Sequence, residues 1–120
     1  MENQLDPVEL RENLSRFSGT ENIYWEPAGD FLYTDGIKYM AEHCGAYWLL
    51  TDGGTRSKAL MERSPFVKIV ITCDEEMAMV EYTDGNGGVL HESRYLCPNF
   101  PLQVFTMYFT GNTLLLPGEY

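Results

Sequence analysis

Two histidines and three cysteines are the side chains in this 120-residue chain best suited to metal binding or nucleophilic catalysis. His43 directly precedes Cys44, whereas His91 and Cys97 are separated by other residues. A structural zinc site needs ligand pairs two to four residues apart, and no two cysteines have that spacing. Cys44 and Cys73 each fall on an apolar periodic face, so we expect inert core thiols. We therefore expect no metal and no other cofactor.

The carboxylates are the next candidates, for acid–base catalysis or cation binding. Glu81 is expected to face Glu92 across two strands, but chance pairs are common among 18 acids. The stretch that begins at Asp84 (DGNGG) resembles the start of a calcium loop, yet an EF-hand needs glycine where Val89 stands. A hairpin loop is the better interpretation. Because no nucleotide-binding or nucleophile-elbow motif is present, the sequence indicates no catalytic residue, and enzymatic activity stays uncertain.

Four aromatic residues are candidates for the wall of a ligand pocket: Tyr24, Trp25, Tyr47 and Trp48. Large rings with one polar atom line binding sites as well as cores. Core packing is the simpler interpretation, and the pocket is kept as an alternative.

The formal net charge is −10, from 18 acids and 8 bases. Nucleic-acid binders carry basic patches, so direct nucleic-acid binding is not expected. An acidic surface can instead steer a small protein to a basic protein partner. We predict Asp74, Glu75, Glu76 and Asp84 as partner-binding residues, since they lie in exposed turns of the expected sheet.

Length and composition predict one domain over residues 1–120. No apolar stretch approaches a membrane span, and the acidic N-terminus is not a secretory signal. Three widely spaced cysteines suggest no disulfide framework. We expect a cytoplasmic protein.

The first half, residues 1–63, is predicted to be mainly helix and loop. Asp6 is a helix N-cap followed by Pro7, and the apolar stripe extends the helix to residue 17. Residues 31–50 are expected to form a buried helical segment with Asp35 as its N-cap. Residues 52–54 (DGG) predict a turn, and residues 55–63 a short helix with Ala59 and Leu60 inward.

The second half, residues 64–120, shows the period of two that is typical of strands. Strands are expected at 67–73, 77–82, 89–95, 102–109 and 113–116. The predicted fold is therefore α+β: N-terminal helices packed on an antiparallel meander of four to five strands, in two layers.

Several stretches together resemble a family of small bacterial and phage proteins that is known only as a domain of unknown function. They are residues 14–21 (LSRFSGTE), 32–36 (LYTDG), 45–50 (GAYWLL) and 114–120 (LLLPGEY). The chain departs from that pattern at Gly118, where serine is expected, and at residues 52–54. The resemblance implies no activity, but its phage setting suggests an inhibitor of host proteins.

The sequence thus favours a non-enzymatic acidic binding protein. It would dock on a basic, nucleic-acid-handling host protein, as an anti-defence inhibitor such as an anti-CRISPR does. One alternative is a small enzyme or ligand-binding domain that uses the aromatic pocket. Another is a homo-oligomer, for example a homodimer, that pairs through an exposed sheet edge at residues 89–95 or 113–116.

Overall fold

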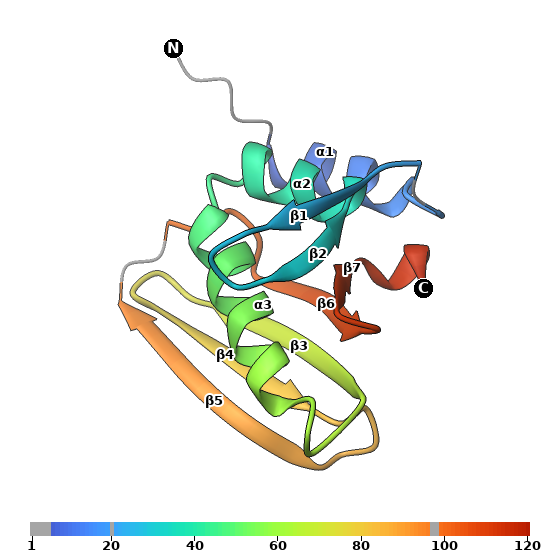
Figure 1. The fold of residues 1–120 in the computed structure, drawn as a ribbon. Coiled ribbons are helices and arrows are strands. Elements are labelled where there is room, and N and C mark those ends of the chain that lie inside the picture. The colour runs from blue at the N-terminus through green and yellow to red at the C-terminus, as the bar shows by residue number, and fades with distance from the viewer. Residues whose placement is uncertain (1–5, 20, 97–98) are drawn as a thin grey trace.

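The computed structural model describes residues 6–19, 21–96 and 99–120. Its elements in chain order are α1 (Pro7–Ser15), β1 (Ile23–Glu26), β2 (Phe31–Thr34), α2 (Asp35–His43), α3 (Tyr47–Leu60), β3 (Phe66–Cys73), β4 (Met77–Thr83), β5 (Val89–Leu96), β6 (Val104–Thr110), β7 (Thr113–Leu115) and the 3-10 turn η1 (Pro117–Glu119). The strands form one seven-stranded sheet in the order β1-β2-β7-β6-β3-β4-β5 (Figure 1). The α+β class is confirmed.

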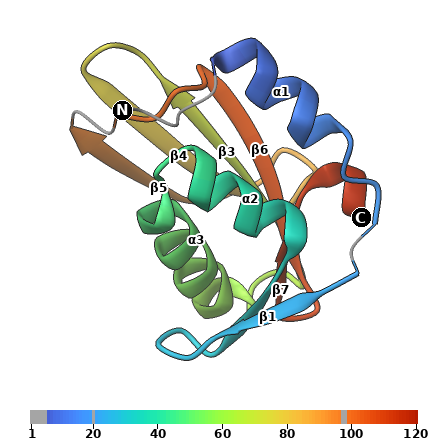
Figure 2. The ribbon, with the colours of Figure 1, turned by 90° about the horizontal axis from the view of Figure 1, so that it is seen from above.

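The layers follow from where the apolar side chains point. Helices α2 and α3 lie on one face of the sheet, and α1 packs beside α2 (Figure 2). Between the layers lies a core of fully buried side chains, among them Phe31, Met40, Leu50, Ile69 and Phe109. Within the described chain, no α-helix covers the opposite face of β3, β4 and β5.

The sheet is larger than the predicted four to five strands, and it is mixed. The two additional strands, β1 and β2, pair antiparallel, and β2 also runs parallel to β7. Residues 31–34, at the start of the predicted helical segment 31–50, form β2 instead. Its local partner is β1, but its second partner, β7, is far away in the sequence, so no local pattern could reveal the parallel pairing.

The later strands occur where the period of two predicted them, but their order is not a simple meander. Strands β3, β4 and β5 do form consecutive antiparallel hairpins. Strand β6 then pairs with β3 instead of β5. Strand β3 is therefore a central strand with a partner on each side, and its inner residues Val67, Ile69 and Ile71 are buried.

The first two helices begin with side-chain caps. The carboxylate of Asp6 accepts hydrogen bonds from the amides of Val8 and Glu9 at 2.8 and 3.0 Å, which confirms the predicted cap of α1. The predicted cap of α2 is wrong: Thr34 Oγ1 accepts from the amide of Ile37 at 3.3 Å, and Asp35 is the first helical residue. Its carboxylate instead accepts from the hydroxyl of Tyr24 at 2.9 Å.

Helix α3 continues through the predicted turn at residues 52–54. A Cβ atom on Gly54 would lie 2.1 Å from Cζ of Phe31, and one on Gly53 would lie 2.8 Å from Cε of Met107. The two glycines therefore let the helix pack closely on the sheet, and they are not a hinge. Leu60 is buried as expected, but Ala59 is exposed.

The C-terminal turn η1 is tied to the start of α2. Glu119 accepts hydrogen bonds from Thr34 Oγ1 at 2.7 Å, from the amide of Gly36 at 3.1 Å and from the amide of Leu116 at 2.9 Å. A carboxylate at a helix N-terminus is favoured by the free amides and the helix dipole. Gly118 suits this turn, because a Cβ atom there would meet the carbonyl oxygen of Phe17 at 2.5 Å.

Candidate protein-interaction face

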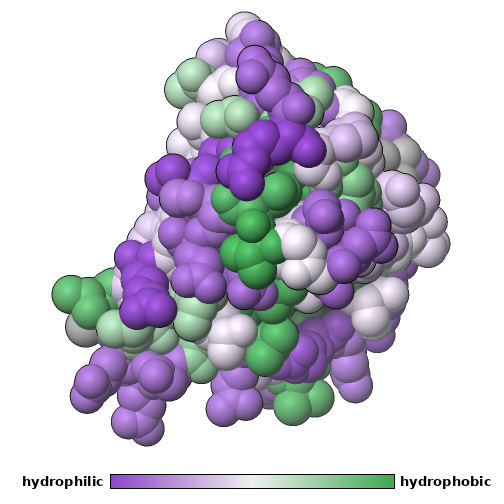
Figure 3. Space-filling model, turned by 90° about the horizontal axis from the view of Figure 1, so that it is seen from below, coloured by the Kyte–Doolittle hydropathy of each residue, from purple (hydrophilic) through white to green (hydrophobic). Residues whose placement is uncertain are grey.

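The face of β3–β6 turned away from α2 and α3, which we call the outer face, is only partly covered by the rest of the described chain. Tyr120 packs on Tyr108 at a centroid distance of 5.4 Å, and α1 and η1 share a hollow with Val104 at the β6 side. Side chains alternate along a strand, and directly paired residues point to the same side. From the pairing registers, the outer face carries Lys68, Val70, Thr72, Met77, Met79, Glu81, Glu92, Arg94, Leu96, Val104, Thr106 and Tyr108. Figure 3, seen from the side opposite that of Figure 2, shows a band of hydrophobic residues bordered by hydrophilic ones.

The exposed apolar side chains of the outer face lie toward its end beside the β3–β4 turn. Met77, Met79 and Val104 keep 38%, 36% and 45% of their surface exposed, and Val70 is half-buried. In the sheet, Val104 lies beside Thr72, which lies beside Met79. Contiguous exposed apolar side chains with a polar border are typical of interaction sites, and methionine adapts to irregular partners.

The predicted partner-binding acids lie at two opposite ends of this face. Asp74, Glu75 and Glu76 form the β3–β4 turn, whereas Asp84 is in the β4–β5 turn. Strand β4 separates the two turns by roughly 20 Å, at about 3.3 Å per residue. The structure therefore brings three of the four together and places Asp84 apart from them.

Both aspartates also build their turns. Asp74 accepts from the amides of Glu76 and Met77 at 2.8 Å each, and Asp84 accepts from the amides of Asn86 and Gly88 at 2.8 and 3.0 Å. These backbone hydrogen bonds lower the pKa of each carboxyl. The Asp84 stretch is therefore a hairpin loop, as predicted.

Two further carboxylates lie between these ends. Glu81 is paired directly with Glu92, as the sequence predicted. Like charges opposite one another destabilise a strand pair, and neither glutamate has an ion pair within the described residues. Together with the turns, the outer face and its ends carry six acids against two bases, Lys68 and Arg94. The outer face is therefore mainly acidic, with exposed apolar side chains near the β3–β4 turn.

The four aromatic residues of the alternative pocket do not meet. Tyr24 stacks on Tyr33 at a centroid distance of 5.4 Å, and Tyr47 is about half exposed. Trp48 packs on Tyr95 with centroids 4.8 Å apart, on the other side of the helical layer. The structure supports no shared pocket wall for these rings.

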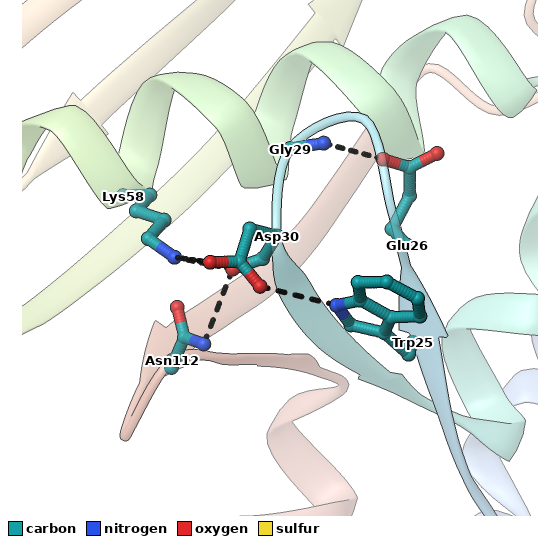
Figure 4. A network of polar contacts seen from close by, with 6 residues as sticks. All are labelled: Trp25, Glu26, Gly29, Asp30, Lys58 and Asn112. Atoms are coloured by element: carbon teal, nitrogen blue, oxygen red, sulfur yellow. Dashed lines mark hydrogen bonds and ion pairs between the residues drawn. The ribbon is translucent and has the colours of Figure 1, made fainter.

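Trp25 belongs to a polar network at the tip of the β1–β2 hairpin (Figure 4). Its indole donates to Asp30 Oδ1 at 3.1 Å, and Lys58 of α3 donates to Asp30 Oδ2 at 3.2 Å. These contacts lower the pKa of the Asp30 carboxyl. Asn112 donates to the carbonyl of Asp30 at 3.3 Å. The network holds Asp30 in a left-handed conformation, with φ of 58°, and fastens the hairpin to α3 and to the β6–β7 turn.

The histidines and cysteines of the described residues do not gather in one cluster. Burial raises the pKa of the Cys44 thiol to about 11 and also raises that of Cys73, and this suits inert thiols. His43 stacks on Tyr39. Across the described ranges, no three His, Cys, Asp or Glu side chains gather as metal ligands would. Cys97 lies outside those ranges.

A polar seam between α3 and β5 was missed by the sequence analysis. Tyr95 donates to Asp52 Oδ2 at 2.7 Å, and His91 Nε2 lies 3.1 Å from Ser93 Oγ. Burial, followed by this hydrogen bond, raises the pKa of Tyr95 to about 12. Asp52 and Arg56 are four residues apart, which could have suggested a helix here, but the intervening glycines predicted a turn.

An apolar hollow of about 330 Å³ lies between α1, β6 and the C-terminal turn. Its walls include Leu14, Phe17, Leu102, Phe105 and Leu116. This volume is at the lower end of the range for small-molecule sites. No residue of the predicted aromatic pocket lines it.

Comparison with known proteins finds one match. The model of a family described as "Family of unknown function (DUF6876)" matches residues 8–120. No curated protein and no solved structure matches the chain. Separately, no helix among the described residues has the length and apolarity of a membrane span.

Proposed function

Since the chain belongs to DUF6876, a family of unknown function, we propose from the geometry that it is a non-enzymatic binding protein. Its outer face would dock on the basic surface of a protein partner. The observation that carries this proposal is the outer face, where exposed apolar side chains lie on the same side of the sheet as an excess of carboxylates.

The exposed apolar side chains would supply affinity. Interfaces have desolvated apolar and aromatic anchors at their centre and a polar rim around them. Met77, Met79 and Val104 are placed as such anchors, because partner contact would remove their exposed surface from water. The residues are held on strands, so their positions are set before binding.

The excess of carboxylates would supply selectivity and fast association. Six carboxylates against two bases favour a positively charged partner and disfavour a negatively charged one. The charge of the whole chain, −10, acts in the same direction at longer range. Association should therefore slow as salt increases.

The partner would be a nucleic-acid-handling protein of the host cell. Such proteins carry basic grooves that neutralise phosphates. An acidic chain that fills the groove would act as an inhibitor, which matches the phage setting of the resemblance and the anti-defence, anti-CRISPR-type role expected from it. DNA and the chain should then compete for the partner.

The test is capture of host proteins on the immobilised chain at low and high salt, with and without added DNA. The variants are Glu75→Lys/Glu76→Lys and Met79→Asp, and the control is Glu12→Lys/Glu62→Lys, which changes the charge equally on the helical side. We expect a basic partner that salt, DNA and both face variants remove and that the control retains. A partner retained by both face variants would contradict the proposal, as would no partner at low salt.

The second candidate function is binding of a small apolar ligand, and the hollow beside α1 favours it. Leu14→Trp should fill this hollow. A hydrophobic fluorescent probe that brightens on the wild type but not on Leu14→Trp would support this function. Equal fluorescence from both proteins would remove it.

A further inference from the structure

The free edge of β5 is a second feature that the fold leaves unpartnered. Strand β5 ends the sheet and pairs only with β4. In the described residues, no main-chain bond outside the ladders reaches residues 91–96, and only the carbonyl of Leu90 receives a side chain, that of Arg63 at 3.1 Å. Figure 1 shows β5 as the outermost strand. An eight-residue edge without proline is a template for another strand.

We infer that the occupant of this edge is β5 of a second copy, in an antiparallel pairing centred on Ser93. The inference does not depend on the partner proposed above. The two-fold axis would run perpendicular to the sheet, so the outer faces of both copies would lie on the same side. Two seven-stranded sheets would then join edge to edge.

The alternation of β5 restricts the possible registers. Glu92, Arg94 and Leu96 point to the outer face, because they pair with Glu81, Met79 and Met77. A regular two-fold pairing must place outer residues opposite outer residues. The two-fold axis must therefore lie level with one residue of β5, which then faces its own copy. It cannot lie midway between two successive residues.

Charge then selects one register among the possible ones. An axis at residue 92 places Glu92 opposite its own copy, and an axis at residue 94 does the same with Arg94. An axis at residue 93 places Glu92 opposite Arg94 of the second copy, twice. Opposite charges stabilise a cross-strand pair and like charges destabilise it.

The charges on β5 fit this register for a further reason. Within the described chain, neither Glu92 nor Arg94 has an ion pair, and Glu92 faces Glu81. The second copy would give each of the two an opposite charge. On the inner side of the strand, the same register places His91 opposite Tyr95, a pairing of two rings.

The main test is sedimentation equilibrium of the pure full chain over a range of concentrations. The variants are Glu92→Arg, Arg94→Glu and the double exchange Glu92→Arg/Arg94→Glu. In the predicted register, each single change places like charges opposite one another in both of the cross-strand pairs between residues 92 and 94. The dimer dissociation constant should therefore rise by at least about tenfold. The double exchange restores opposite charges and should return the constant to near the wild-type value.

The matched controls are Glu75→Arg and Lys68→Glu, which change charge equally but lie off the edge. They should leave the dissociation constant within about threefold of the wild type. A monomeric wild type at all concentrations would overturn the inference. So would single variants that dimerise normally, or a double exchange that does not recover.

A covalent test gives an independent answer. Ser93→Cys places a thiol opposite its own copy, whereas Arg94→Cys places it opposite Glu92 of the second copy. Mild oxidation should form a reducible dimer rapidly with Ser93→Cys and slowly with Arg94→Cys. Equal rates, or a faster Arg94→Cys, would overturn the register. Because pure protein is used, failure here leaves the proposed function untouched.

Discussion

The two faces of the central strands differ although the same strands build both. On β3, the side chains of Val67, Ile69 and Ile71 face the helices and are at most 1% exposed. The alternate residues, Lys68, Val70 and Thr72, face away and stay half-buried or exposed. One face is therefore a packed core, and the other is a surface.

This difference assigns stability to the inner face and interaction to the outer face. The inner face meets α2 and α3 closely enough that two glycines of α3 are needed for contact. On the outer face, Met77, Met79 and Val104 remain exposed. Substitutions on the inner face should lower stability, and substitutions on the outer face should change binding.

The largest expected effect is on the free energy of unfolding, when truncations on the two faces are compared. Ile71→Ala removes a fully buried side chain and should lower the free energy of unfolding by about 3 kcal/mol. Met79→Ala, on the outer face of the paired strand, should change it by less than about 0.5 kcal/mol. Urea denaturation measures both. Equal losses from the two variants would contradict the assignment of faces.

The next effect tests the close approach of α3 to the sheet. Gly54→Ala should lower the free energy of unfolding by about 2 kcal/mol, because its Cβ would overlap the ring of Phe31. At an exposed helix position, alanine instead stabilises a protein by about 1 kcal/mol relative to glycine. The sign of the measured change in unfolding free energy therefore shows whether residue 54 is packed on the sheet. Thermal unfolding compared with Thr55→Ala, at an exposed helical position, provides the control. A stabilised Gly54→Ala would contradict the close approach of α3 to Phe31.

A somewhat smaller effect tests the link between the C-terminal turn and α2. Glu119→Ala removes the acceptor of three hydrogen bonds and should lower the free energy of unfolding by about 1.5 kcal/mol. Glu12→Ala, on the exposed side of α1, is the control. Hydrogen exchange should also accelerate at the start of α2 in the Glu119 variant alone. Unchanged exchange there would show that the turn does not cap the helix.

The smallest effect is a pH dependence that originates in the core. Burial raises the pKa of Cys44 from 9.0 to about 11, so the unfolded chain releases this proton at lower pH than the folded chain. Stability should therefore fall between pH 9 and pH 11, with a loss of about 1 kcal/mol from this thiol near pH 10. Cys44→Ala should show a shallower slope of unfolding free energy against pH. Parallel slopes would mean that the thiol is not buried in the folded chain.

Local patterns predicted those elements whose signal is itself local. The cap at Asp6 and the buried face of Ile37, Met40 and Cys44 follow from spacing along one helix. The strands from β3 onward were found because one face is apolar and the other is not. The same alternation also placed Glu81 opposite Glu92.

The remaining errors concern residues whose role depends on distant partners. Gly53 and Gly54 suggest a turn until the ring of Phe31 is found against them. Segments far apart in the sequence meet where β2 pairs with β7 and where Thr34 donates a hydrogen bond to Glu119. The four candidate acids were predicted to form one binding site. The sequence does not show that β4 separates Asp74 from Asp84.

The sequence by itself therefore determined the α+β class, the acidic character and the alternation that makes one sheet face apolar. These properties depend on residue type and on neighbours in the chain. Only the tertiary structure decided the strand order, the position of α3, and which face and edge stay exposed. Those features depend on the packing of segments far apart in sequence, and side-chain period carries no information about which segments will meet.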